Sequence, residues 1–132
     1  MPETMPMRSA DMKDSGERRQ FSTGAVRDVV TGKPRPELVS PIMMERLAAW
    51  LAKGAVKYSD RNWEKGIPLS QSLGSLMRHT LSWMLGRTDE DHLAAMVCNA
   101  MFLIHTDEMI RRGALPAELD DLPKYPPPAE GK

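Results

Sequence analysis

The sequence is short of cysteine, of aromatic residues and of net charge. Its 132 residues include one cysteine, Cys98, so no disulfide can form within the chain, and a buried thiol in a reducing compartment is expected. Eighteen basic residues balance eighteen acidic ones, which argues against a general electrostatic attraction to nucleic acids or anionic membranes. Aromatic residues make up 5% of the chain and β-branched runs are short, so helices are favoured over sheets.

Long apolar runs and several well-known catalytic motifs are also missing. No apolar run approaches the roughly 20 residues of a membrane span, and the N-terminus lacks the apolar core of a signal peptide. The chain has no phosphate-binding glycine loop, dinucleotide-binding glycine pattern, nucleophile elbow, cysteine pair or HExxH motif. We therefore expect a cytoplasmic protein that binds neither membranes nor nucleic acids directly and forms no covalent intermediate.

What is present is three segments with helical periodicity. The first should begin with Ser40 as N-cap and Pro41 at the first helical position. The second should begin near Ser70 and end at Gly86, and the third should span residues 90–112. The sequence thus predicts an all-α fold, a small bundle of three to four helices with an extended N-terminal arm and irregular tails.

Apolar residues at helical spacing predict the buried face of each helix. In the first helix they are Met43, Leu47, Trp50 and Leu51. In the second they are Leu69, Leu73, Leu76, Met77, Thr80 and Met84. In the third they are Leu93, Met96, Val97, Ala100, Leu103 and Ile104.

The two ends of the chain lack this periodicity. Residues 1–20 are polar and charged and predict a mobile tail, and residues 123–132 form a proline-rich tail. We expect a single helical domain over residues 21–122. Within its N-terminal arm, the valine-rich stretch 26–30 predicts a short strand or an ordered arm packed on the helices.

Histidines and acids gather where the second and third helices should be joined. His79 lies on the second helix, and Asp89, Glu90, Asp91 and His92 lead into the third. In an antiparallel hairpin they lie near the same end, and two imidazoles with carboxylates suit a divalent metal such as Mg²⁺, Mn²⁺ or Co²⁺. The alternative is that the acids only cap the helix and complement its dipole.

The stretch KGAVKYSDRNWEKG, residues 53–66, is unusually rich in charged and aromatic side chains. It offers rings that can stack on a base, an amide for a base or sugar edge, and cations for phosphates. The residues concerned are Lys57, Tyr58, Asp60, Arg61, Asn62, Trp63 and Lys65. The alternative is an ordinary turn in which Trp63 seals the core.

Two further polar residues stand out on the helices. Asn99 lies in the most apolar segment of the chain, where an unpaired amide costs roughly 1–3 kcal/mol. It makes either an interhelical hydrogen bond or a polar contact in a ligand or metal pocket. Arg78 adjoins His79 but points about 100° away around the helix, so a solvated arginine and a ligand contact both stay open.

Three motifs resemble, in order and spacing, the phage proteins called dATP/dGTP diphosphohydrolase N-terminal domain proteins. They are GAVRD…TGKPRPELV, LAKGAVKYSDRNWEKG and RHTLSWMLGRTDEDHLAAMVCNAMFLIHTDE, and the resemblance covers about residues 24–108. It places on the family's motif positions the seven residues of the stretch above together with Arg78, His79, His92 and Asn99. The family looks like a branch related to the all-α, MazG-like nucleotide pyrophosphatases.

The resemblance implies metal-dependent hydrolysis of a purine deoxynucleoside triphosphate to the monophosphate and pyrophosphate. It also implies a homo-oligomer acting in the cytoplasm of a phage-infected bacterium. The chain departs from the MazG-like pattern of ExxE followed by ExxD, because ExxE is absent and the one ExxD, Glu118 to Asp121, is interpreted as a chance match. His79, Asp91 and His92 stand at the corresponding places.

The leading hypothesis makes His79, Asp91 and His92 catalytic. With help from Glu90 they would hold the metal, while the cations of residues 57–65 neutralise the triphosphate. Two alternatives remain: a non-catalytic nucleotide-binding or regulatory module, and a small helical protein whose methionine-rich faces bind a partner.

Overall fold

The computed structural model describes residues 12–129 and divides into two compact units, Met1–Leu38 and Val39–Lys132. The first unit contains the antiparallel strands β1 (Arg18–Gln20) and β2 (Val26–Asp28), followed by the 3-10 turn η2 (Pro36–Leu38). The β2 strand falls in the valine-rich stretch, whereas β1 occupies the end of the segment predicted to be a tail. Residues 1–11 of that predicted tail lie outside the described residues.

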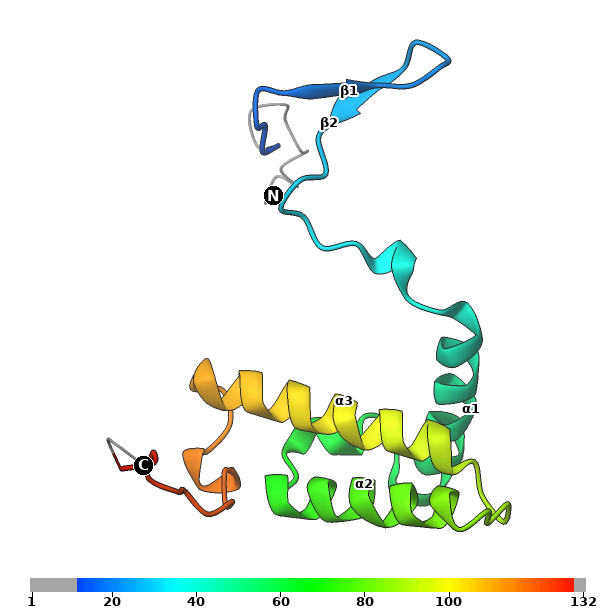
Figure 1. Ribbon diagram of the computed structural model, residues 1–132, viewed down its shortest axis with the longest axis vertical. Helices are drawn as coiled ribbons and strands as arrows, with labels where there is room; N and C mark the ends of the chain where they lie inside the picture. Colours follow the sequence, from blue (N-terminus) through cyan, green and yellow to red (C-terminus); the bar gives the residue numbers. More distant parts are fainter. Residues whose placement is uncertain (1–11, 130–132) are drawn as a thin grey trace, which may run out of the picture. The chain divides into compact units, whose positions relative to one another are not determined.

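The second unit carries the three predicted helices, which confirms the mostly helical fold. They are α1 (Pro41–Tyr58), α2 (Leu69–Met84) and α3 (His92–Arg111), with the 3-10 turns η3 (Asn62–Lys65) and η4 (Ala117–Leu119). Helices α2 and α3 run side by side as an antiparallel hairpin, and α1 crosses steeply near their connected end (Figure 1).

Capping side chains define the helix ends much as the sequence predicts. The Met43 amide donates to Ser40 Oγ at 3.2 Å, and Pro41 opens α1. Gly86 after α2 and Gly113 after α3 have φ of +75° and +72°, the left-handed conformation that glycine adopts without steric cost. The start of α2 has a partner far along the chain, because Ser70 N donates to Asp121 Oδ1 at 2.9 Å. Asp121 of the ExxD match therefore has a structural role.

The predicted core faces need correction. Helix α3 buries Ala94, Ala95 and Cys98, whereas Ile104 of the predicted stripe is 71% exposed. Because α3 is apolar on most sides, its sequence pattern does not identify a single face. On α2, Met77 and Met84 belong to the predicted face but are exposed. The reason is that, within residues 12–129, both α1 and α2 pack mainly on α3, so this part of α2 has no helix to cover it.

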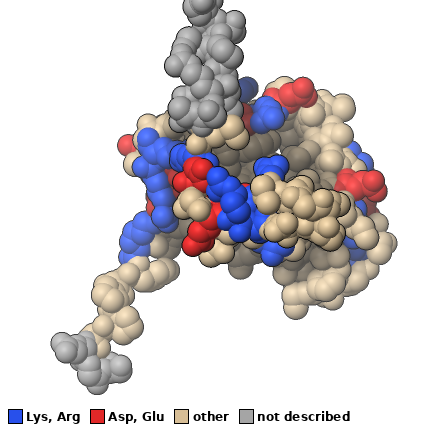
Figure 2. Space-filling view, turned by 90° about the horizontal axis from the view of Figure 1, so that it is seen from above, with Lys and Arg blue, Asp and Glu red and all other residues tan. Residues whose placement is uncertain are grey.

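Helix α3 is, by length and composition alone, apolar enough to cross a membrane. The sequence had predicted no such segment. In the structure this helix packs against both α1 and α2 and buries polar side chains, among them His92, Asn99 and Thr106. Of its most apolar 18-residue window, 28% is buried inside the structure. On the face drawn in Figure 2, basic and acidic side chains lie beside one another.

Candidate functional site

A cavity of about 670 Å³ lies between α1, η3, α2 and α3. Its charged and polar lining residues are Lys53, Lys57, Tyr58, Ser59, Arg61, Asn62, Gln71, Ser72, Ser75, Arg78, His79, Asp89, Glu90 and Asn99. Trp50, Trp63, Cys98 and Phe102 contribute to the less polar part of the wall. All of these belong to the second unit, so one compact body forms the cavity.

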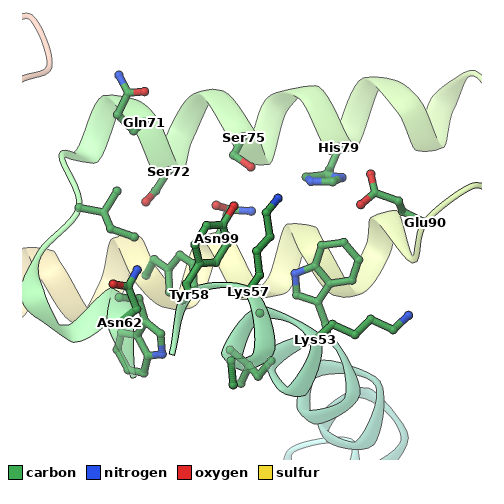
Figure 3. A pocket seen from close by; sticks show the side chains of 18 of the residues that line it. Lys53, Lys57, Tyr58, Asn62, Gln71, Ser72, Ser75, His79, Glu90 and Asn99 are labelled. Atoms are coloured by element: carbon green, nitrogen blue, oxygen red, sulfur yellow. The ribbon is translucent and has the colours of Figure 1, made fainter. Parts of the chain in front are cut away.

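The two ends of the cavity differ in chemistry (Figure 3). Lys53, His79 and Glu90 lie toward one end, and Lys57 extends into the space from α1. Asn62, Gln71 and Ser72 lie toward the opposite end, which offers neutral hydrogen-bonding groups. Such a cavity suits an elongated ligand with a charged part and a neutral polar part.

The two histidines predicted from the sequence meet at the charged end. His79 Nδ1 lies 2.9 Å from His92 Nδ1, and the rings of Trp50 and His79 form a T-shaped pair with centroids 5.7 Å apart. His92 is 4% exposed, and its Nε2 lies 2.9 Å from Asp89 Oδ1. This hydrogen bond holds the pKa of Asp89 below its usual value. An ionised carboxylate accepts but does not donate, so the proton of this hydrogen bond lies on Nε2, and Nδ1 is the ring nitrogen that faces His79.

This arrangement has the donor set of a divalent-metal site. One ligand atom from each of His79, Glu90 and His92 lies within 4.8 Å of the others. The two Nδ1 atoms are 2.9 Å apart, close to the spacing of about 3 Å that adjacent ligands have in an octahedral shell with bonds near 2.1 Å. The Asp89–His92 pair repeats the common pattern in which a carboxylate orients a metal-binding histidine. The residues present therefore fit a small divalent ion.

Asp91, also predicted to bind the metal, is not part of this cluster. Its two oxygens accept from Arg46 Nε at 3.0 Å and Nη2 at 2.6 Å, and Oδ1 also accepts from the Ala94 amide at the start of α3. The Arg46 hydrogen bonds hold the pKa of Asp91 below its usual value. Asp91 thus joins α1 to the N-terminus of α3, next to His92.

Replacing Asp91 with alanine is expected to lower the free energy of unfolding by about 1–2 kcal/mol at pH 7, because the helix cap and the ion pair are both lost. A carboxyl group whose pKa is lowered by folding stabilises the protein above its unfolded pKa of about 3.9. That contribution is lost as the pH falls through the lower folded value, so the two proteins should converge in acid. Denaturant unfolding at several pH values measures the difference.

The matched control is Asp107→Ala on the same helix. Asp107 is half-exposed and pairs with Arg111 one turn away, at 3.1 Å. Its loss should change stability by no more than about 0.5 kcal/mol. Equal stability of Asp91→Ala and wild type at pH 7 would contradict the capping role.

The stretch 53–66 divides between cavity wall and surface. Lys57, Tyr58, Arg61, Asn62 and Trp63 line the cavity, whereas the predicted Asp60 and Lys65 are exposed and do not line it. Within the wall, the Arg61 guanidinium pairs with the Glu64 carboxylate at 2.6 Å. The Lys57 ammonium lies over the Tyr58 ring, 5.0 Å from its centroid.

Trp63 packs on the helical core, as the alternative of a sealing residue predicts, and it also lines the cavity. It stacks on Phe102 of α3 with centroids 5.5 Å apart and meets the edge of His105 at 4.8 Å. These contacts anchor the η3 turn to the helical core. The same side chain lines the cavity, so it is a plug and a wall residue together.

The chain turns out of α1 through two non-glycine residues with positive φ. Ser59 has φ +86° and ψ 161°, a region adopted almost only by glycine, and Arg61 is left-handed at φ +53°. The strain places Asn62 and Trp63 at the cavity.

Replacing Ser59 with glycine is expected to raise the free energy of unfolding by about 1 kcal/mol, because glycine adopts this backbone conformation without steric cost. Chemical denaturation measures the change. The control Ser82→Gly, inside α2, should instead destabilise by about 0.5–1 kcal/mol. A loss of stability in Ser59→Gly would show that the backbone is not strained there.

Several cavity residues were not predicted from the sequence, namely Lys53 on α1 and Gln71, Ser72 and Ser75 on α2. Ser72, Ser75 and His79 share one face at i, i+3 and i+7, a spacing that the sequence does contain. Arg78 is exposed and lines the cavity, and its side chain lies back over Gly74, where an added Cβ would come within 3.1 Å of Nη1. Asn99 is 8% exposed and donates from Nδ2 to the Ala95 carbonyl at 2.8 Å, not to another helix.

Comparison with known proteins identifies the family. The model of the N-terminal domain of dATP/dGTP diphosphohydrolase matches residues 23–113, which include α1, α2, α3 and all the cavity residues named above. Neither the curated proteins nor the solved structures gave a match. By its match over more than half its length, this chain belongs to the dATP/dGTP diphosphohydrolase N-terminal domain family.

Proposed function

We propose that the protein binds a purine deoxynucleoside triphosphate in the cavity and hydrolyses it to the monophosphate and pyrophosphate. The observation that carries the proposal is the pairing of His79 and His92 beside Glu90, at the end of the cavity that Lys53 also lines. A triphosphate requires cations and a divalent ion at one end and neutral groups at the other. The family's description supplies the substrate class.

The residues have distinct roles in this proposal. His79, His92 and Glu90 hold a divalent ion, and such an ion supplies Lewis-acid chemistry to phosphate oxygens and to water. Asp89 keeps the His92 ring in the orientation that directs Nδ1 inward. Asp91 acts on the site by holding the start of α3 through Arg46.

The remaining wall binds the rest of the nucleotide. Lys57 and Lys53 balance the phosphate charge, and Arg61 and Arg78 add positive charge at exposed positions. Tyr58 offers an exposed ring for stacking, while one face of Trp63 already packs on Phe102. Asp60 and Lys65 do not line the cavity, and nucleotide binding by these two residues stays a prediction.

We also propose that the chain assembles with copies of itself in a bacterial cytoplasm during phage infection. The support for self-assembly is a group of apolar side chains near the end of α2 that are exposed to solvent. Met77, Leu81, Met84 and Leu85 are 60%, 53%, 71% and 60% exposed. Association would bury this apolar surface.

The direct test is incubation of the purified protein with each of the four deoxynucleoside triphosphates and Mg²⁺, Mn²⁺ or Co²⁺. We expect dATP and dGTP to yield monophosphate and pyrophosphate, and EDTA to stop the reaction. No product with any of these metals would exclude the hydrolase.

A second candidate is a nucleotide-binding module without catalysis. It is favoured by the single carboxylate in the metal group found among residues 12–129, since magnesium prefers several oxygen ligands. Thermal stabilisation by dATP or dGTP that EDTA does not change, without product, would support it. No response to any nucleotide, together with tight self-association in light scattering, would instead support an interaction protein.

A further inference from the structure

The α2 wall carries a serine hydroxyl with no hydrogen-bond partner in the described part of the chain. Ser72 is 3% exposed and lines the cavity. On the same helix, the hydroxyl of Thr80 donates to the Leu76 carbonyl at 2.9 Å, whereas neither Ser72 nor Ser75 has such a bond within residues 12–129. A hydroxyl that no protein group engages is free to bond a ligand in the cavity, so a ligand that meets the Ser72 hydroxyl gains a hydrogen bond.

The position of Ser72 relative to the histidine pair indicates which part of a nucleotide it meets. At about 1.5 Å of rise per residue, Ser75 lies about 6 Å and Ser72 about 10 Å along α2 from His79. If the reacting phosphate lies at His79, the sugar follows near Ser75 and the base follows near Ser72. Figure 3 shows these three side chains in this order along the cavity, with Asn99 opposite on α3.

We propose that the Ser72 hydroxyl recognises the substituent at position 6 of a purine base. Adenine presents an amino donor there and guanine a carbonyl acceptor. A serine hydroxyl both donates and accepts and can rotate, whereas a carboxylate accepts only and an ammonium donates only. One serine therefore explains how a single site takes both dATP and dGTP, which deepens the proposed function and rests on it.

A pyrimidine base is shorter than a purine base, and this difference makes the site selective for purine nucleotides. Its single ring is shorter than a purine and does not reach Ser72 when the phosphates stay at His79. A pyrimidine therefore lacks the hydrogen bond that the Ser72 hydroxyl makes to a purine, and it binds more weakly than a purine for that reason. Asn99 contributes at the same level, because its Nδ2 is bonded to Ala95 and its Oδ1 is left for the ligand.

The test is the binding of each nucleotide to wild type and Ser72→Ala by isothermal titration calorimetry in EDTA, where no turnover occurs. We expect the variant to bind dATP and dGTP each about fivefold to tenfold more weakly. Its affinity for dCTP, dTTP and inorganic tripolyphosphate should not change. Ser82→Ala on the same helix is the control, because the Ser82 hydroxyl accepts from Arg87 and does not line the cavity.

Three results would overturn the proposal. These are unchanged binding of both purines, an equal loss for tripolyphosphate, and the absence of any nucleotide binding by the wild type. A thermal melt of Ser72→Ala that matches wild type shows that the fold is intact. Because binding is measured without metal, a protein that binds purines but never hydrolyses them would refute the proposed hydrolase and leave the role of Ser72 standing.

Discussion

Replacing His79 with alanine will lower the turnover of dATP and dGTP by about 100-fold or more and leave nucleotide binding in EDTA unchanged. The physical reason is that His79 Nδ1 and His92 Nδ1 face each other at 2.9 Å as the nitrogen donors of the metal group. Loss of an outer-shell partner costs metal sites about 10–100-fold, and loss of a direct ligand costs at least as much. Steady-state kinetics and Mn²⁺ titration calorimetry measure the two effects.

His105→Ala is the matched control for this variant. His105 lies on α3 against the Trp63 ring, away from the metal group, so its loss should leave Mn²⁺ affinity unchanged. His92→Asn should behave as His79→Ala does. A His79→Ala protein with normal turnover, or with normal Mn²⁺ affinity, would refute the metal site.

Asp89→Asn is expected to weaken divalent-metal binding by about 10-fold, with a matching loss of activity at limiting metal. The amide can present its NH₂ group to His92 Nε2, and this would favour the tautomer that has its proton on Nδ1. The Nδ1 lone pair would then be lost to the metal. Activity measured across a range of Mn²⁺ concentrations tests this, because saturating metal should restore it.

Asp60→Asn serves as the control, since Asp60 is exposed and does not line the cavity. A defect in Asp89→Asn that saturating metal does not restore would mean that Asp89 acts on something other than metal affinity. Unchanged metal binding would mean that the Asp89–His92 hydrogen bond does not orient the ligand. Either result would refute the positioning role.

Local rules predicted the helices well. Ser40, Pro41, Gly86 and Gly113 act through contacts within a few residues, and each helix begins or ends beside the predicted residue. The contact between His79 and His92 was predicted in outline for a similar reason. The connection between α2 and α3 is short, so the two helices form an antiparallel pair. Residues near the end of α2 therefore lie close to residues near the start of α3.

Predictions that depended on long-range packing were less accurate. The core stripe of α3 was misplaced because an almost uniformly apolar helix can bury any of several faces, and the choice depends on where α1 and α2 pack. The role of Asp91 as a metal ligand stays a prediction. Its pairing with Arg46, which lies 45 residues earlier, depends on tertiary packing, and no local sequence pattern indicates it. Ser72 and Ser75 were overlooked because a serine acquires a role only when a cavity forms beside it.

The sequence by itself determined the three helices, their caps and the family, because these depend on residue types at fixed short spacings. The tertiary structure alone decided which polar groups share the cavity. It placed Glu90 beside the two histidines and paired Asp91 with Arg46 instead. It also brought Asp89 into a hydrogen bond with His92, and it placed Ser72 and Asn99 on facing helices of the cavity. The physical reason is that hydrogen bonds and ligand sites require atoms within about 3 Å, and only the packing of α1 against the α2–α3 pair brings distant segments that close.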